Sequence, residues 1–186
     1  MPGKVTPRMP ELVCHPHTPS RVARAVTIKV TRSVDAKLSL HYQLHGAVAR
    51  MHIPAPAPAR IGWELWRHTC CELFVRREGD EAYHEFNFSP SGEWAAFAFS
   101  GYRDGRSLTD ENLNPQVAVE SQPERLDLYA LADLARLSPS YRQGRLRVGL
   151  AVIIEEETGG YSYWALRHPP GKPDFHRQEA FALVLE

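Results

Sequence analysis

Two glutamates on neighbouring expected strands, Glu72 and Glu85, carry the chemistry that stands out in this sequence. Asn87 lies two positions after Glu85, so its amide shares one strand face with that carboxyl group. Carboxylates accept strong hydrogen bonds from hydroxyl groups. Indole rings supply flat apolar area for the C–H face of a sugar, and the chain has four of them: Trp63, Trp66, Trp94 and Trp164. These residue types predict a shallow groove for a small hydroxylated ligand.

The same two carboxyl groups could serve a glycosidase, which needs an acid and a base on either side of the scissile bond. The sequence contains no nucleophile elbow, no phosphate-binding loop and no dinucleotide-binding glycine fingerprint. We therefore expect a protein that is not an enzyme and that has no catalytic residues.

A proline-rich segment late in the chain holds a second group of polar side chains: His168, Lys172, Asp174 and His176. Two imidazoles and a carboxylate could bind a divalent ion, but their spacing matches no strong ligand pattern. The same is true of an earlier cluster that consists of Cys14, His15 and His17. We expect no metal site and no cofactor.

Short strands must position these residues. Residues 37–46 alternate strictly between apolar and polar side chains, and residues 145–154 place five aliphatic side chains on one face. Weaker alternation predicts strands at 11–17 (an edge strand), 22–32, 49–53, 70–76, 83–89, 94–99, 116–120, 126–130, 161–168 and 180–185. Residues 130–137 favour a short helix or turn, and residues 101–115 favour a long loop. The expected fold is all-β, an antiparallel β-sandwich of jelly-roll or immunoglobulin-like type with little helix.

The composition describes an ordinary globular chain of 186 residues with a formal net charge of zero. We expect a flexible N-terminus over residues 1–10 and a single domain over residues 11–186. The balanced charge argues against nucleic acid as a partner, and the absence of a long apolar run argues against a membrane. No apolar segment follows the first basic residues, which suggests a cytoplasmic protein. Cys70 and Cys71 point to opposite strand faces, so we expect free thiols, as in a reducing compartment.

Three segments resemble bacterial DOMON-like proteins, which are akin to the family-9 carbohydrate-binding modules. They are WRHTCCELFV at 66–75, YHEFNFSPSGEW at 83–94 and SYWALRHPPGKPDFH at 162–176. The resemblance extends over residues 11–186. It implies a jelly-roll β-sandwich that binds a ligand without catalysis.

In the family-9 modules, two tryptophans clamp a sugar and polar side chains hold its hydroxyl groups. By position, the resemblance assigns the clamp to Trp66 and Trp164 and a hydroxyl contact to Glu72. It assigns a further contact to Glu85, where the family can carry a basic residue. The family can also bind calcium, for which this chain offers only a short acidic turn at 78–81. Other DOMON domains hold haem through a Met/His pair, and here the methionines are Met1, Met9 and Met51.

We therefore expect a non-catalytic domain that binds a carbohydrate or a similar polyol. The expected ligand-binding residues are Trp66, Glu72, Glu85 and Trp164, with Arg103 and Lys172 contributing from loops. Two alternatives stay open: a protein-interaction or structural domain, and a haem-binding or metal-binding domain of the DOMON type. The sequence leaves the ligand and the oligomeric state undetermined.

Overall fold

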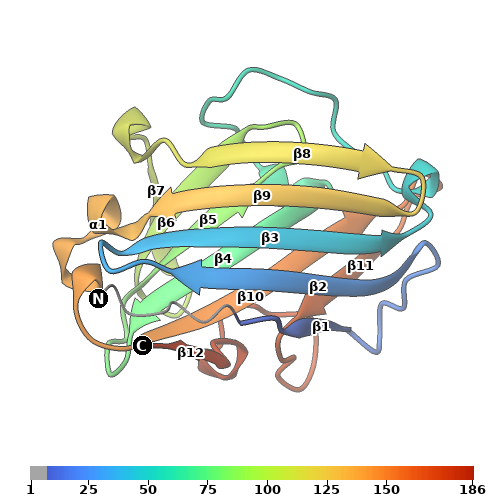
Figure 1. Cartoon of the computed structure of the whole chain (residues 1–186). Coiled ribbons are helices and arrows are strands. Elements are labelled where there is room, and N and C mark those ends of the chain that lie inside the picture. The colour runs from blue at the N-terminus through green and yellow to red at the C-terminus, as the bar shows by residue number, and fades with distance from the viewer. Residues whose placement is uncertain (1–7) are drawn as a thin grey trace.

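Two antiparallel sheets face each other in the computed structural model, which describes residues 8–186 (Figure 1). This β-sandwich confirms the fold class that the sequence predicted. Residues 1–7 of the expected flexible N-terminus lie outside the described residues. Arg8 and Pro10, from the same segment, accept backbone hydrogen bonds from Val30 and Ile28.

The front sheet in Figure 1 has four main strands, in the order β2-β3-β9-β8. Their bounds are β2 Ala23–Arg32, β3 Lys37–Gly46, β9 Arg125–Asp133 and β8 Gln116–Gln122. The strands cross the picture side by side in front of the other layer. Strand β3, which has the strictest alternation in the sequence, therefore pairs with β2 on one side and with β9 on the other.

The rear sheet has the order β7-β6-β5-β4-β10-β11, and β12 also pairs with β10. Its bounds are β4 Cys70–Arg77, β5 Tyr83–Phe88, β6 Trp94–Gly101, β7 Asp104–Leu108, β10 Leu146–Glu155, β11 Tyr161–Ala165 and β12 Leu183–Leu185. Strand β1 (Glu11–Cys14) pairs with β2 through its first half and with β11 through its second half. It therefore joins the two sheets, and the prediction that it is an edge strand is wrong.

The core lies between the sheets and follows from the period-2 alternation. Side chains on β3 and β10 that share one strand face are buried together: Leu38, Leu40, Tyr42, Leu44, Leu146, Val148, Leu150, Val152 and Ile154. The hydroxyl of Tyr42 crosses the core and donates to the backbone carbonyl of Glu72 at 2.9 Å. Burial of these apolar side chains is the main force that holds the two sheets together.

Helices are few and short. They comprise α1 Leu134–Leu137 and five 3₁₀ turns at Val48–Arg50, Leu65–Arg67, Glu111–Leu113, Pro139–Arg142 and Gln178–Ala180. Of the expected helix at 130–137, only α1 forms, because β9 continues to Asp133. Within residues 8–186, no helix has the length and apolar character needed to cross a membrane.

Two further predictions about the connections are wrong. The expected strand at 49–53 does not form: its first two residues belong to the 3₁₀ turn Val48–Arg50, and Met51 makes a single β-bridge. The expected loop at 101–115 contains strand β7, which pairs with β6 at the end of the rear sheet. Strand β7 is exposed along most of its length. A strand that is open to solvent on both faces has no need of apolar alternation, so the pattern could not reveal it.

Candidate functional site

Glu72 and Glu85 come together on the outer face of the rear sheet. Strands β4 and β5 pair so that Glu72 lies opposite Asn87 and Phe74 lies opposite Glu85. The two carboxyl groups are therefore diagonal neighbours on one face, as the sequence predicted. The alternate residues of β4 point the other way, into the core.

These carboxyl groups lie in a cleft of about 370 Å³. Its polar lining is Glu72, Glu85, Arg103 and His176, and its apolar lining is Trp66, Phe97, Phe99, Ile153, Tyr163, Pro173 and Phe175. Small-molecule sites usually combine a few converging polar groups with apolar walls in this way. The cleft is therefore the candidate site.

Trp66 forms part of one wall. It belongs to the 3₁₀ turn Leu65–Arg67, which leads into β4, and Leu65 packs inward against Cys70. The indole is 40% exposed and contacts the Phe97 ring edge-on, with ring centroids 5.9 Å apart. Trp66 therefore presents a partly exposed aromatic surface beside the carboxyl groups, in agreement with its predicted place.

The two carboxyl groups are only 3% and 6% exposed, for Glu72 and Glu85 respectively. Burial raises the pKa of Glu85 to about 7, while the nearby Asn87 amide and Arg103 charge act in the opposite direction. Burial, followed by repulsion from Glu85, raises the pKa of Glu72 well above its usual range. The pair therefore retains at least one proton near neutral pH and can both donate and accept hydrogen bonds.

Arg103 is the cation that faces the pair. Its guanidinium donates to Asp174 at 3.0 Å, and Tyr102 donates to the same carboxylate. Arg103 lies in the tight turn between β6 and β7 with φ of 55°, a left-handed conformation that costs an L-residue free energy. Glycine would suit this turn better, so an arginine here is consistent with a role for its side chain.

His176 lies beside Glu85, with its Nε2 atom 3.9 Å from the carboxylate. Burial, followed by the charge of Arg103, lowers the pKa of His176 to about 4, so the ring is neutral at pH 7. The Tyr83 hydroxyl accepts from the Arg103 backbone N–H at 3.2 Å and lies 2.9 Å from Nδ1 of His176. When the Tyr83 hydroxyl donates to Nδ1 of His176, both the donor and the acceptor of that hydroxyl have a partner. The Nε2–H group then points toward Glu85 as a further donor.

Asn87 is fully buried next to the pair. It lies opposite Glu72 on β4 and opposite Ala95 on β6. Neither its amide nitrogen nor its amide oxygen makes a hydrogen bond of normal geometry with any residue in the described range 8–186. A buried polar group without a hydrogen-bond partner in the protein is uncommon. The Asn87 amide therefore offers an unused donor and an unused acceptor next to Glu72 and Glu85.

The structure corrects the prediction for Trp164. This indole is 5% exposed, belongs to the sandwich core and donates to Ser162 at 3.0 Å. A ring inside the core cannot stack on a ligand in the cleft, so the predicted clamp role is wrong. Its neighbour Tyr163 points the other way and lines the cleft instead.

Of the two loop residues that were predicted to contact a ligand, Arg103 lines the cleft and Lys172 does not. Lys172 is exposed in the same loop, whereas Pro173, Phe175 and His176, which follow it, line the cleft. The other polar residues of the loop separate. Asp174 and His176 contact the cleft residues Arg103 and Glu85, while His168 bonds to the backbone of Val13.

The two metal clusters weighed in the sequence are not assembled. The loop histidines diverge as described above, and Nδ1 of His15 accepts from the His17 backbone N–H instead of facing a ligand set. In the described part of the chain, one other group of side chains has the proximity that a metal ion requires: His52, His68 and Glu155.

Sequence reasoning missed four aromatic walls of the cleft: Phe97, Phe99, Tyr163 and Phe175. Strand register is the signal that could have found the first two. Phe97 lies opposite Glu85, and Phe99 lies opposite Tyr83. If the register of the hairpin between β5 and β6 had been assigned from its short turn, both rings would have been placed on the sheet face that carries Glu72 and Glu85.

The fold is the β-sandwich of the family-9 carbohydrate-binding modules. One similar structure is that of a protein from Bacteroides uniformis ATCC 8492, for which carbohydrate binding is inferred. The alignment covers 95% of this chain and 84% of the Bacteroides protein. The TM-score is 0.69 and the sequence identity is 15%.

Two structures of a family-9 module from Caldicellulosiruptor kristjanssonii also align. The cellotriose complex has a TM-score of 0.54 and 9% identity, and the alignment covers 91% of this chain and 76% of the module. The glucose complex has a TM-score of 0.51 and 10% identity, and the alignment covers 91% of this chain and 78% of the module. No protein-family model and no curated protein matches the sequence itself. These similarities show a shared fold.

Proposed function

We propose that the cleft on the rear sheet binds a carbohydrate or a similar polyol and that the protein does so without catalysis. The observation that carries this proposal is the meeting of two buried carboxyl groups with aromatic walls in one open cleft. The structural neighbours support it, because the family-9 module with the same fold has been solved in complex with glucose and with cellotriose.

Each part of the lining has a counterpart on a sugar. The rings of Trp66, Phe97 and Tyr163 offer apolar surface to the C–H groups of a pyranose. Glu72 and Glu85 accept hydrogen bonds from hydroxyl groups, and the remaining proton of the pair can be donated. The guanidinium of Arg103 and the Nε2–H group of His176 supply further donors. The volume of about 370 Å³ lies at the small end of the usual range, roughly 300–1,000 Å³, and suits one or two sugar units.

A two-dimensional amide NMR titration against mono- and disaccharides tests the proposal. The panel includes glucose and cellobiose, and the indole N–H signals of the four tryptophans serve as reporters. We expect a saturable shift of the Trp66 indole, whereas the core indoles of Trp94 and Trp164 move little. A sugar that shifts no reporter at millimolar concentration would count against carbohydrate as the ligand class.

Trp63 and Trp66 form a matched pair for mutation. Trp63 is 76% exposed and is not part of the cleft lining, whereas Trp66 is. Trp66→Ala should weaken sugar binding at least tenfold with a small change in thermal midpoint, because the ring is partly exposed. Trp63→Ala should leave the affinity unchanged. Equal losses in the two variants would mean that the binding surface is not this cleft.

The glycosidase alternative is tested in the same material. Chromogenic glycosides should show no turnover with the wild-type protein. Turnover that disappears in Glu72→Gln would replace the binding proposal with an enzymatic one, because the raised pKa values of the pair would then serve acid–base chemistry.

A further inference from the structure

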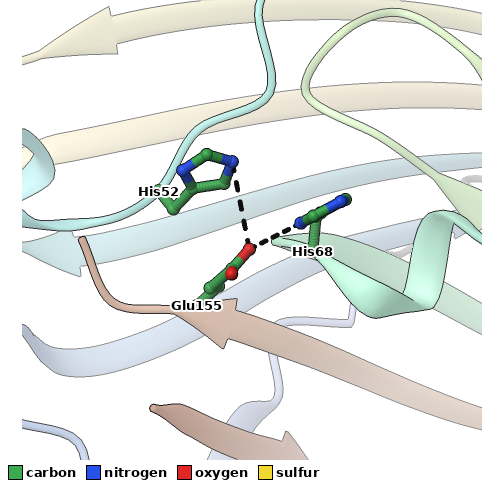
Figure 2. Close-up of side chains that lie close together, drawn as sticks. All are labelled: His52, His68 and Glu155. Carbon is green, nitrogen blue, oxygen red and sulfur yellow. Dashed lines mark hydrogen bonds and ion pairs between the residues drawn. The ribbon is translucent and has the colours of Figure 1, made fainter. Parts of the chain in front are cut away.

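Two histidines and a glutamate meet at one end of the rear sheet, outside the cleft (Figure 2). His52 follows the 3₁₀ turn Val48–Arg50, His68 follows the turn that carries Trp66, and Glu155 ends strand β10. His52 and His68 belong to the same long connection between β3 and β4, and Glu155 follows His68 by 87 residues. Figure 2 shows both imidazoles directed toward the Glu155 carboxylate.

One oxygen of the carboxylate is shared by the two rings. Oε2 of Glu155 lies 2.7 Å from Nδ1 of His68 and 4.0 Å from Nε2 of His52. The two ring centroids are 5.4 Å apart. One potential ligand atom from each residue lies within 4.8 Å of the other two.

These distances are close to those of a tetrahedral metal site. Bonds of about 2.0–2.1 Å at tetrahedral angles place neighbouring ligand atoms about 3.3 Å apart and imidazole centroids about 5 Å apart. The observed separations therefore need changes of less than about 1.5 Å, which rotation of exposed imidazoles can supply. Side-chain exposures of 44% for His52 and 53% for His68 leave a path for the ion and room for a water ligand.

The backbone and the neighbouring side chains hold Glu155 in place. Its N–H donates to the Thr69 hydroxyl at 3.1 Å, and its carbonyl accepts from the His52 N–H at 2.8 Å. The Tyr161 hydroxyl lies 3.2 Å from Oε1, the carboxylate oxygen that does not contact His68. Oε2 is therefore the oxygen that faces both imidazoles and would bind the ion. Glu157 lies 3.7 Å from Nδ1 of His52, where it can orient that ring.

We propose that His52, His68 and Glu155 bind a divalent transition-metal ion of the zinc class, with water in the fourth position. Two imidazole nitrogens and one carboxylate oxygen suit Zn²⁺ and disfavour Ca²⁺ and Mg²⁺, which prefer oxygen ligands. The site is distinct from the sugar cleft, and the proposal does not depend on carbohydrate binding.

The bound ion would link the turn that carries Trp66 to strand β10 of the rear sheet. His68 lies two residues after Trp66, and Glu155 lies two residues after Ile153, another lining residue of the cleft. A metal link between His68 and Glu155 fixes the start of β4 against the end of β10. Ion binding therefore stabilises the folded protein by mass action.

Isothermal titration of the metal-free full chain with zinc chloride tests the proposal. We expect one equivalent to bind, the thermal midpoint to rise with zinc concentration, and calcium chloride to have no effect at the same concentration. The imidazole signals of His52 and His68 should shift in a long-range ¹H–¹⁵N NMR spectrum. Binding should weaken at acidic pH, because the ligating nitrogens must be deprotonated.

His68→Ala and His52→Ala should each weaken zinc binding by at least about tenfold. His17→Ala is the matched control, because it removes an exposed histidine of the Cys14 cluster. The variants remove exposed rings, and thermal unfolding in a chelator verifies that they fold. Zinc binding that survives in the double variant His52→Ala/His68→Ala, or that disappears in His17→Ala, overturns the proposal.

Discussion

Replacement of Glu85 by glutamine should stabilise the protein at alkaline pH and have little effect at mildly acidic pH. The carboxyl group is buried, and its pKa in the folded state is raised to about 7. In the unfolded chain the same group ionises near pH 4.5. Between these values the folded state holds a proton that the unfolded state has released. The stability of the wild type therefore falls as the pH rises through this window.

The magnitude follows from the two pKa values. Each tenfold change in proton affinity is worth about 1.4 kcal/mol, so a rise from 4.5 to about 7 corresponds to about 3 kcal/mol in full. Between pH 5 and pH 8, the part of the window that is easily measured, the expected loss is about 2–3 kcal/mol. Glutamine has the shape of the protonated acid and carries no charge at either pH.

Urea unfolding of the wild type and of Glu85→Gln at pH 5 and pH 8 measures this quantity. The stability advantage of the variant over the wild type should grow by about 2–3 kcal/mol between pH 5 and pH 8. Glu81→Gln is the control, because Glu81 is exposed and its substitution should give the same small difference at both pH values.

The outcome that would refute the reasoning is a free-energy difference between Glu85→Gln and the wild type that is equal at the two pH values. Glu85 would then titrate like an exposed acid, and the inference that its carboxyl group is buried in the cleft would be wrong. Repulsion from Glu85 also contributes to the raised pKa of Glu72. A stabilisation somewhat larger than calculated therefore agrees with the structure.

Two further predictions concern the core. Tyr42→Phe removes the hydroxyl that donates to the Glu72 carbonyl, and chemical denaturation should show a loss of about 1 kcal/mol; an unchanged stability would mean that this hydrogen bond contributes nothing. Trp164→Phe should lower stability by roughly 1–3 kcal/mol, because it opens a cavity in the core. The same variant should keep its sugar affinity, and a selective loss of binding in the NMR titration would restore the clamp role.

The strands with the clearest alternation were predictable. Residues 37–46 became β3 with the expected bounds, and the expected strand at 145–154 became β10, shifted by one residue at each end. A strand that is buried on one face must alternate, so the pattern records its burial directly. Alternation could not predict strand β7 or the place of β1 between the two sheets. Both features depend on the backbone pairing partner of the strand, which the side-chain pattern does not specify.

The sequence by itself determined that Glu72 and Glu85 share one sheet face, since adjacent strands with period-2 alternation bring equivalent faces together. It could not determine which face of β11 is inner. Trp164 and Tyr163 are both large and apolar enough to be buried, and only the packing of the front sheet put the indole in the core. The cluster of His52, His68 and Glu155 is likewise a product of tertiary structure. Glu155 lies 87 residues after His68 in the sequence, so only folding brings its carboxylate to the two histidines.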